Sequence, residues 1–352
     1  MKKNNTLTMI KRFLPIALLL GPLMARAQFS DFGLGLDQPK EEAHVTAQWI
    51  SEGASIQPGQ PFWLALHLKM DAHWHTYWKN AGDAGLATSV DPWELPEGFT
   101  AGELQWPWPE RIVWQDFVNF GYHDEVFLPV RITPPADLEA GKEVTLGGTA
   151  SWLVCKDVCI MGSTNISLTL PVSADPPVAN DKWASAFEST RKKLPLTDAG
   201  WSFAGYVQDD KVTIQAGPAS PPTEAIEMED FFPYPEMTIA GTKPAQWTRT
   251  DSGSYELTAF LDESLTNTPE RLSGVILAKQ GWDGEGSTRS IAFDVALTEG
   301  PPPAGQPEEQ GTTAAPTAAT EETSAAPPAV KKPAALPVQL LFAFLGGLIL
   351  NL

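Results

Sequence analysis

Short segments that are apolar, or that alternate apolar and polar side chains, recur along residues 28–298 and are separated by Gly, Pro and Asp. Residues 166–170 alternate apolar and hydroxyl side chains, which is typical of a strand with one buried face. Ten such segments predict strands: 44–50, 61–70, 126–133, 143–154 and 164–172 in the first half, and 201–207, 212–216, 255–261, 272–278 and 290–297 in the second. The pattern therefore predicts an all-β fold.

A helical pattern interrupts these strands over residues 181–193. Trp183 and Phe187 are four positions apart and would lie on one face of a helix. Asn180 or Asp181 is suited to cap the first turn, basic residues end the segment, and a proline follows two positions later. We place the boundary between two domains at this helix.

The two ends of the chain carry targeting-like segments, and a linker precedes the second of them. Residues 1–27 combine basic residues, a short apolar segment and an Ala-Arg-Ala site, which predicts a secretory signal peptide. Residues 299–335, rich in Pro, Ala, Thr and Glu, predict a disordered linker. The uncharged residues 336–352 predict the start of a truncated first transmembrane helix. The rest forms two predicted domains, 28–178 and 179–298, which we expect to be tandem immunoglobulin-like antiparallel β-sandwiches.

The net charge of the chain and its lack of nucleotide-binding motifs argue against several classes of function. The formal net charge is −19, and removing the signal peptide would take away five basic residues and no acidic one. So acidic a chain repels phosphate backbones, which argues against nucleic acid as a partner. The sequence has neither a Gly-x-Gly-x-x-Gly nor a Gly-x4-Gly-Lys-Ser/Thr motif, so no nucleotide is expected, and we predict no other cofactor.

The only two cysteines, Cys155 and Cys159, are separated by three residues. This spacing lets the chain fold back so that the sulfurs meet, and an exported chain can keep the resulting disulfide. A bridge across so short a loop removes little entropy from the unfolded chain, which favours a redox pair over a structural bridge or a metal site. All three interpretations stay open here. Because no helix pattern starts at Cys155 to lower its pKa, we expect the pair to be a substrate of a thioredoxin-like partner.

Two histidines indicate a second kind of chemistry. His73 and His75 stand at alternate positions and would share one face of a strand. Together with Cys155 and Cys159 they could bind Cu(I), which is a soft metal. We favour a plainer interpretation, in which both histidines are polar residues beside buried tryptophans at the edge of a sandwich.

Several carboxylates could lie beside the thiols, where they would raise the thiol pKa or move protons. They are Asp116, Asp124, Glu125 and Asp157. In a chain this acidic, each of them by itself is better explained as part of a solvated loop.

Six stretches of the sequence carry a resemblance to a known family. They are residues 73–80, 82–85, 105–107, 121–122, 128–130 and, above all, Trp-Leu-Val-Cys-Lys-Asp-Val-Cys at 152–159. The chain resembles the N-terminal periplasmic region of DsbD-type thiol:disulfide interchange proteins, especially their ScsB (suppressor of copper sensitivity) branch. The last apolar residues are similar to the start of that family's first membrane helix.

The resemblance implies a protein-disulfide reductase that relays electrons. In the family, the membrane domain and a C-terminal thioredoxin-like domain of the same protein reduce the N-terminal domain, which then reduces thioredoxin-fold proteins of the periplasm. Carried over, Cys155 and Cys159 would form the exchanging disulfide. Phe117 would cap this pair and Asp116 would be a nearby acid, with Asp157 as a further candidate for proton transfer.

The resemblance also implies a location and leaves two rival functions. We expect the chain in the inner membrane of a Gram-negative bacterium, with residues 28–335 in the periplasm. The second domain, 179–298, has no cysteine and no histidine, so we assign it to orientation or partner recognition. The alternative function is a copper-tolerance protein that binds Cu(I) through the two cysteines with His73 and His75. A third possibility is a purely structural tandem sandwich.

Overall fold

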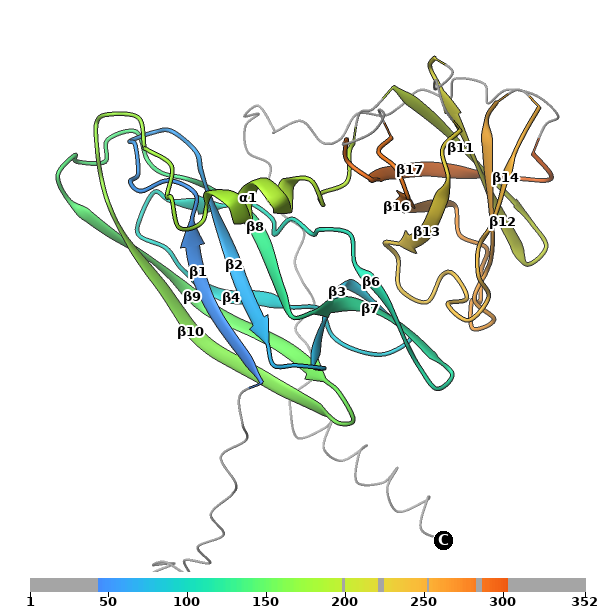
Figure 1. Cartoon of the computed structure of the whole chain (residues 1–352), viewed down its shortest axis with the longest axis horizontal. Helices are drawn as coiled ribbons and strands as arrows, with labels where there is room; N and C mark the ends of the chain where they lie inside the picture. The colour runs from blue at the N-terminus through green and yellow to red at the C-terminus, as the bar shows by residue number, and fades with distance from the viewer. Residues whose placement is uncertain (1–43, 198–199, 221–224, 252, 283–286, 303–352) are drawn as a thin grey trace, which may run out of the picture. The chain divides into compact units, whose positions relative to one another are not determined.

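The computed structural model describes residues 44–197, 200–220, 225–251, 253–282 and 287–302 (Figure 1). The predicted signal peptide, the predicted transmembrane segment and nearly all of the predicted linker lie outside these ranges. Within them the chain consists of strands and one short helix, which confirms the all-β prediction. Over the same residues, no helix has the length and apolar character needed to cross a membrane.

Ten strands precede the helix and seven follow it. The first ten are β1 (Val45–Ser51), β2 (Phe62–Met70), β3 (His75–Gly82), β4 (Ser89–Glu94), β5 (Thr100–Ala101), β6 (Glu110–Trp114), β7 (Phe117–His123), β8 (Glu125–Thr133), β9 (Glu143–Cys155) and β10 (Cys159–Pro171). After the helix α1 (Ala184–Arg191) come β11 (Trp201–Gln208), β12 (Lys211–Pro218), β13 (Met228–Pro233), β14 (Gln246–Arg249), β15 (Tyr255–Phe260), β16 (Arg271–Ala278) and β17 (Ser290–Glu299).

All ten predicted strands have a counterpart in the structure, but β3 to β7, β13 and β14 were not predicted. Strand β3 shows the physical reason. It buries the polar residues Thr76 and Asn80 together with their apolar neighbours, so its sequence has no apolar–polar alternation. Strand β7 buries Asn119 in the same way. A strand buried on both faces cannot be recognised from a period of two.

The helix is shorter than the predicted segment 181–193. The N–H of Ala184 donates to the backbone carbonyl of Asn180 at 2.9 Å, and the N–H of Lys182 donates to the Asn180 side chain at 3.3 Å. The N–H of Trp183 also donates to the Asn180 carbonyl, so Asn180 satisfies three backbone donors at the start of the helix, as a capping residue does. Residues 181–183 form a turn, and helical geometry begins only at Ala184.

Two sheets form the first half of the described chain. One has the strand order β1-β2-β8-β5, and the other has the order β10-β9-β3-β7-β6, with β4 also paired to β9. In β2 the alternate residues Leu64, Leu66 and Leu68 are completely buried, and Leu146 of β9 is buried as well. Because residues two apart in a strand share a face, these side chains fill a sandwich-like core.

The second half forms a seven-stranded sheet in the order β13-β16-β17-β11-β12-β15-β14. Strand β17 joins its two parts, because Ser290 to Ala296 pair with β16 and Leu297 to Glu299 pair with β11. The β17–β11 pairing is parallel, which corrects the expectation of purely antiparallel sheets. The core includes Val212, Ile214, Leu257, Leu272, Ile276 and Phe293. The immunoglobulin-like topology of the two halves stays a prediction.

The described chain divides into two compact units, and the division is discontinuous. The first unit combines the described part of Met1–Tyr77 with Leu86–Leu104 and Gly121–Ala184, and the second combines Trp78–Gly85, Gln105–Phe120 and the described part of Ser185–Leu352. Strands β3 and β7 therefore contribute residues to both units. The predicted boundary between residues 178 and 179 stays a prediction.

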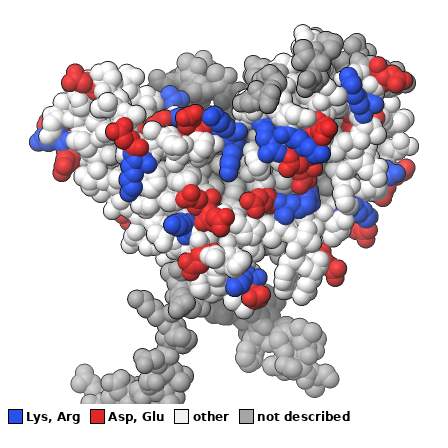
Figure 2. Space-filling view, viewed as in Figure 1, with Lys and Arg blue, Asp and Glu red and all other residues white. Residues whose placement is uncertain are grey.

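Acidic and basic side chains are interspersed on the face drawn in Figure 2, where Lys and Arg do not gather into a continuous stripe. Several charged side chains of the described chain form exposed ion pairs, such as Lys192 with Glu188 at 2.9 Å and Arg271 with Asp294 at 2.9 Å. Pairs of this kind contribute little to stability, because water screens them.

Candidate functional site

Strands β9 and β10 form a long hairpin whose tip is closed by the two cysteines. Cys155 ends β9, Cys159 begins β10, and their Cα atoms are direct partners in the antiparallel ladder. Their sulfurs are bonded at 2.07 Å. Between them the chain turns, and the N–H of Lys156 donates to the carbonyl of Val158 at 3.1 Å. The hairpin thus presents a disulfide at its end.

The two bonded cysteines differ in burial. Cys155 is 3% exposed, whereas Cys159 lies on the surface. Val158 and Met161 flank Cys159 and are 60% and 62% exposed. A thiolate of another protein can therefore attack the sulfur of Cys159, and the sulfur of Cys155 is then the leaving group.

Tyr77 of β3 contacts the buried sulfur. Its hydroxyl donates to Cys155 Sγ at 2.9 Å and lies 3.9 Å from Cys159 Sγ. Burial raises the pKa of Tyr77, so the phenol keeps its proton at neutral pH and remains a donor. Because hydrogen bonds to charged acceptors are the stronger ones, this hydroxyl stabilises a thiolate on Cys155 more than it stabilises the disulfide.

His75, the first residue of β3, pairs directly with Cys155 across the strands. It is 7% exposed, and its ring makes edge contacts with Tyr77 at 5.3 Å and a tilted contact with His123 at 5.5 Å. Burial, and to a smaller extent the neighbouring His123, lowers the pKa of His75 to about 4. The imidazole is therefore neutral at physiological pH.

The structure separates the two histidines that the copper interpretation combines. His73 lies in the turn before β3 with a φ of 70°, and its side chain is exposed, whereas His75 is buried inside the strand. Alternation along one strand therefore does not place them on a common face. In the part of the chain that the structure describes, no three His, Cys, Asp or Glu residues come together in a way that could hold a metal ion.

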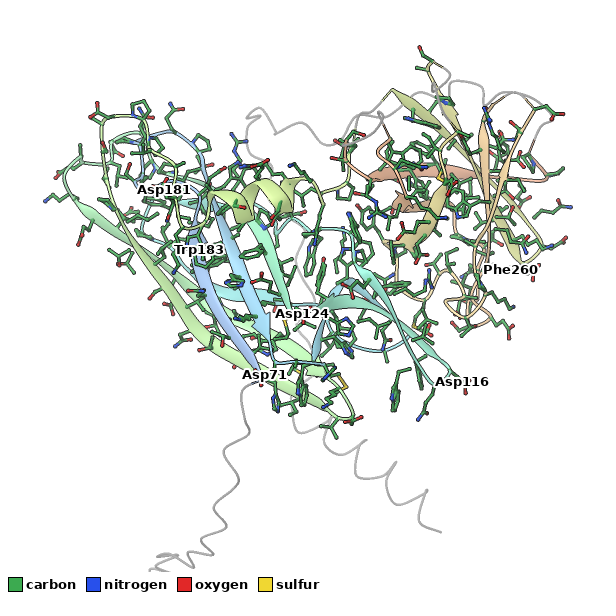
Figure 3. The ribbon with its side chains drawn as sticks, in the orientation of Figure 1. Asp71, Asp116, Asp124, Asp181, Trp183 and Phe260 are labelled. Atoms are coloured by element: carbon green, nitrogen blue, oxygen red, sulfur yellow. A yellow bond between two sulfur atoms is a disulfide. The ribbon has the colours of Figure 1, made fainter. Side chains whose placement is uncertain are left out.

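Three of the four acidic candidates lie between strands, and Glu125 begins β8. Asp157 is exposed in the turn between the two cysteines, and Asp124 lies between β7 and β8. Asp116 is at the end of the β6–β7 hairpin (Figure 3), next to Phe117, which is 44% exposed and stacks on Trp114 with 6.4 Å between ring centroids. Asp116 and Phe117 belong to the second unit, whereas both cysteines belong to the first. Their roles as cap and acid stay predictions. Glu125 pairs with His67 Nε2 at 2.9 Å.

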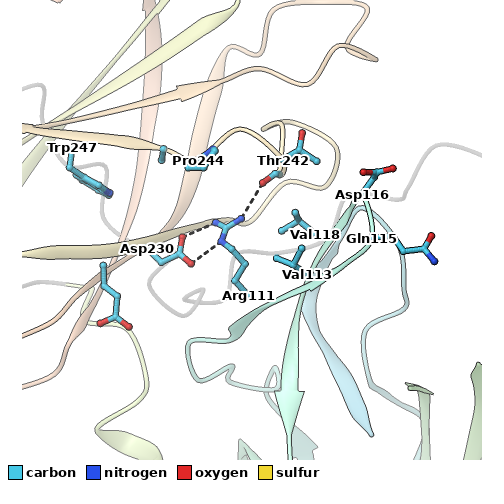
Figure 4. Close-up of a pocket in the computed structure, with 12 residues that line it drawn as sticks. Arg111, Val113, Gln115, Asp116, Val118, Asp230, Thr242, Pro244 and Trp247 are labelled. Carbon is cyan, nitrogen blue, oxygen red and sulfur yellow. Dashed lines mark hydrogen bonds and ion pairs between the residues drawn. The ribbon is translucent and has the colours of Figure 1, made fainter. Parts of the chain in front are cut away.

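A cavity of about 530 Å³ lies within the second unit, beside the β6–β7 hairpin (Figure 4). Arg111 of β6 lines it and makes two hydrogen bonds with the carboxylate of Asp230, at 2.7 and 2.9 Å. The same guanidinium donates to the carbonyls of Phe231 at 3.1 Å and Gly241 at 3.3 Å. These bonds use four of the five N–H groups of Arg111, which therefore holds β6 and β13 together rather than offering a free cation to a ligand.

Tyr77 is the functional residue that the sequence did not reveal as such. It lies two positions after His75, so both side chains share a face once residues 75–82 are known to form a strand. That strand could not be recognised because nearly all of its side chains are buried. The spacing of His75 and Tyr77 was visible in the sequence. Without a predicted strand over residues 75–82, it did not indicate that the two side chains share a face.

Residues 46–171 match the model of the family described as thiol:disulfide interchange protein DsbD, N-terminal, which confirms the resemblance noted above. No curated protein matches the chain. Among solved structures, the N-terminal periplasmic domain of ScsB from Proteus mirabilis is 17% identical, with a TM-score of 0.48, covering 72% of this chain and 92% of that one. A protein of unknown function from Porphyromonas gingivalis W83 is 13% identical, with a TM-score of 0.20, covering 72% and 100% of the two chains.

Proposed function

Residues 46–171 are similar to the N-terminal region of the DsbD family of thiol:disulfide interchange proteins, and on this premise we propose that the chain is a periplasmic thiol–disulfide exchange protein. Cys155 and Cys159 are the exchanging pair, alternately disulfide and dithiol. The observation that carries the proposal is the asymmetry of this pair: one sulfur is exposed at a hairpin tip, and the other is buried beneath a hydroxyl donor.

The exchange takes place in two displacements. A thiolate of a protein dithiol attacks Cys159 Sγ, a mixed disulfide forms there, and the Cys155–Cys159 bond breaks with its electron pair on Cys155 Sγ. The hydroxyl of Tyr77 stabilises that new thiolate. The second thiol of the donor, as a thiolate, then displaces Cys159, so the donor leaves as a disulfide and this chain keeps two electrons. The reverse sequence passes the electrons to a partner disulfide.

The wider role that we propose is a relay. A membrane domain and a thioredoxin-like domain of the same full-length protein supply the electrons, and thioredoxin-fold proteins of the periplasm receive them. The second domain, residues 179–298, contains no cysteine, so it takes no part in thiol transfer and serves orientation or partner recognition. The chain is then the reductant-presenting part of an inner-membrane protein-disulfide reductase.

Single cysteine variants test the exchange. A thioredoxin-fold protein in its disulfide form is incubated with Cys155→Ser, which keeps the exposed thiol, and with Cys159→Ser, which keeps the buried one. We expect the first variant to accumulate a mixed disulfide with the partner at least about tenfold faster than the second, since access governs the attacking thiol. Equal rates, or no mixed disulfide with either variant, would count against the proposal. The double variant is the matched control.

A further inference from the structure

The position of His75 links it to the leaving sulfur. His75 and Cys155 are direct Cα partners in the antiparallel β3–β9 ladder. Side chains of such partners stand on the same face of the sheet, with their Cβ atoms about 4.5–5.5 Å apart. Tyr77, two residues along β3, stands on that face as well, and its hydroxyl bonds Cys155 Sγ at 2.9 Å. The imidazole, the phenol and the buried sulfur therefore form one cluster within the first unit.

In the disulfide state, one ring nitrogen of His75 makes no hydrogen bond. Its Nε2 is buried without a hydrogen-bond partner among the described residues, in a side chain that is 7% exposed. A buried polar atom without a partner is unfavourable and calls for an explanation. A disulfide sulfur has no proton to donate, so it cannot satisfy an unprotonated Nε2, and it is only a weak acceptor for a protonated one. A cysteine thiol or thiolate at the same position can.

Opening of the disulfide would add a negative charge beside the imidazole. The titratable groups of the described chain that face it are His123 from β7, Tyr77 from its own strand and Cys155 from β9. None of them is negative while Cys155 is in a disulfide, so burial keeps the imidazole neutral. A thiolate on Cys155 would add the opposite charge at short range, and this favours the protonated imidazole.

We propose that His75 is a positioning residue for the exchange: when the disulfide opens, its imidazole binds a proton and pairs with the thiolate of Cys155. This inference rests on the proposed thiol–disulfide exchange. The electron pair of the broken S–S bond stays on Cys155 Sγ, and the partner sulfur becomes bonded to Cys159. The proton that Nε2 binds comes from solvent. The imidazolium lowers the free-energy cost of a negative charge on the buried sulfur of Cys155. The neutral imidazole is restored when the disulfide re-forms.

The direct test follows the protonation of His75 in both redox states. The chain contains five histidines, so selective isotope labelling of histidine gives few NMR signals, and the signal missing from His75→Asn identifies His75. The protein is titrated as the disulfide and again after chemical reduction with a phosphine. We expect the pKa of His75 to be roughly 1 to 3 pH units higher in the reduced protein. The same pKa in both states would overturn the proposal, and both titrations are made on the protein with His75 in place.

A second readout follows the sulfur. In the reduced protein, the thiolate absorbance of Cys155 is titrated in a Cys159→Ser background, with and without His75→Asn. We expect His75→Asn to raise the thiolate pKa by roughly 1 to 3 pH units. His73→Asn is the matched control: His73 is exposed, and its positive φ is one that asparagine adopts readily, so the thiolate should not respond. An equal response to both variants would contradict the proposal.

Chemical reduction separates this inference from the proposed function. If the phosphine opens the disulfide and His75 does not change its protonation, the inference about His75 fails while exchange with protein partners stands. If no thioredoxin-fold protein forms a mixed disulfide with Cys159, the proposed function fails whatever His75 does.

Discussion

The hydroxyl of Tyr77 donates to the buried sulfur of Cys155, and its effect on that sulfur is measurable. In the reduced protein, Tyr77→Phe removes the bond to Cys155 Sγ without changing the size of the ring. We expect the thiolate pKa of Cys155 to rise by roughly 1 pH unit, since a hydrogen bond to the charged form is lost. The pKa is measured by titrating the thiolate absorbance of Cys155 in a Cys159→Ser background.

Tyr255→Phe is the matched control for this variant. The hydroxyl of Tyr255 accepts a hydrogen bond from the N–H of Ile226 at 2.8 Å, in the second unit. Loss of this bond should cost about 1 kcal/mol of stability and leave the thiol unchanged. A shift of the Cys155 pKa in the control, or none in Tyr77→Phe, would show that the phenol does not tune the sulfur.

His75 also makes stability depend on pH in the disulfide form. Its pKa is about 4 in the folded protein, compared with 6.5 for an unburied histidine. Between these values the unfolded chain binds more protons, so stability falls as the pH drops from about 6.5 to about 4, by an amount on the order of 2–3 kcal/mol. Urea unfolding at several pH values in this range measures how steeply the free energy of unfolding changes with pH. This dependence should be weaker in His75→Asn. An unchanged slope in that variant would assign the pH dependence to other groups.

The sequence identified the two cysteines because their spacing is a local property. It did not reveal the environment of the sulfurs, because this comes from pairing between β3 and β9, which are about seventy residues apart in the chain. His75 was noticed as a possible metal ligand. Its partner across the strands, and hence its relation to Cys155, depends on a register that no local pattern contains.

At the scale of elements, Arg111 and Asp230 join β6 to β13 within the second unit. Their side chains are 27% and 22% exposed, so this ion pair is less screened than a surface pair. Asp230→Asn leaves the guanidinium with a weaker acceptor. We expect the free energy of unfolding of that unit to fall by about 1–3 kcal/mol. Urea unfolding and amide hydrogen exchange at β6 would measure it.

The pair of Arg271 and Asp294 provides the control for that variant. It joins β16 to β17 in the same unit, with side chains 52% and 61% exposed. Asp294→Asn should change stability by less than about 0.5 kcal/mol. If both variants lose the same stability, burial does not explain the strength of the Arg111 pair.

Long strands with one buried face were predictable from alternation, and β2 and β16, which are buried on both faces, were predictable from their mainly apolar sequences. Residues 166–170 alternate cleanly and lie in β10, whose burial pattern alternates as well. Strand β10 begins five residues before its predicted start, because the hairpin reaches back to Cys159. The short strands β5 and β14 have too few residues to show any period. Sequence patterning therefore found strands that alternate or are mainly apolar, and missed short strands and strands that bury polar residues, such as β3 and β7.

At the scale of the whole molecule, the sequence indicated two halves but not how the chain is divided between them. Residues 78–85 and 105–120 group with the second unit, although they lie far before the helix that was taken as the boundary. Asn80 shows the physical basis, because its side chain donates to the carbonyls of Pro233 at 2.8 Å and Pro235 at 3.2 Å. Such contacts join residues about 150 positions apart and leave no trace in local composition.

The reduction potential of the Cys155–Cys159 pair tests the central claim most directly. The chain is equilibrated in glutathione or dithiothreitol buffers of known potential, and the fraction of free thiol is measured. An exchanging pair should have a potential of roughly −180 to −270 mV, in the range of known thiol–disulfide exchange proteins. A value well below about −300 mV would mark a structural disulfide that the proposed partners cannot reduce, and would contradict the account.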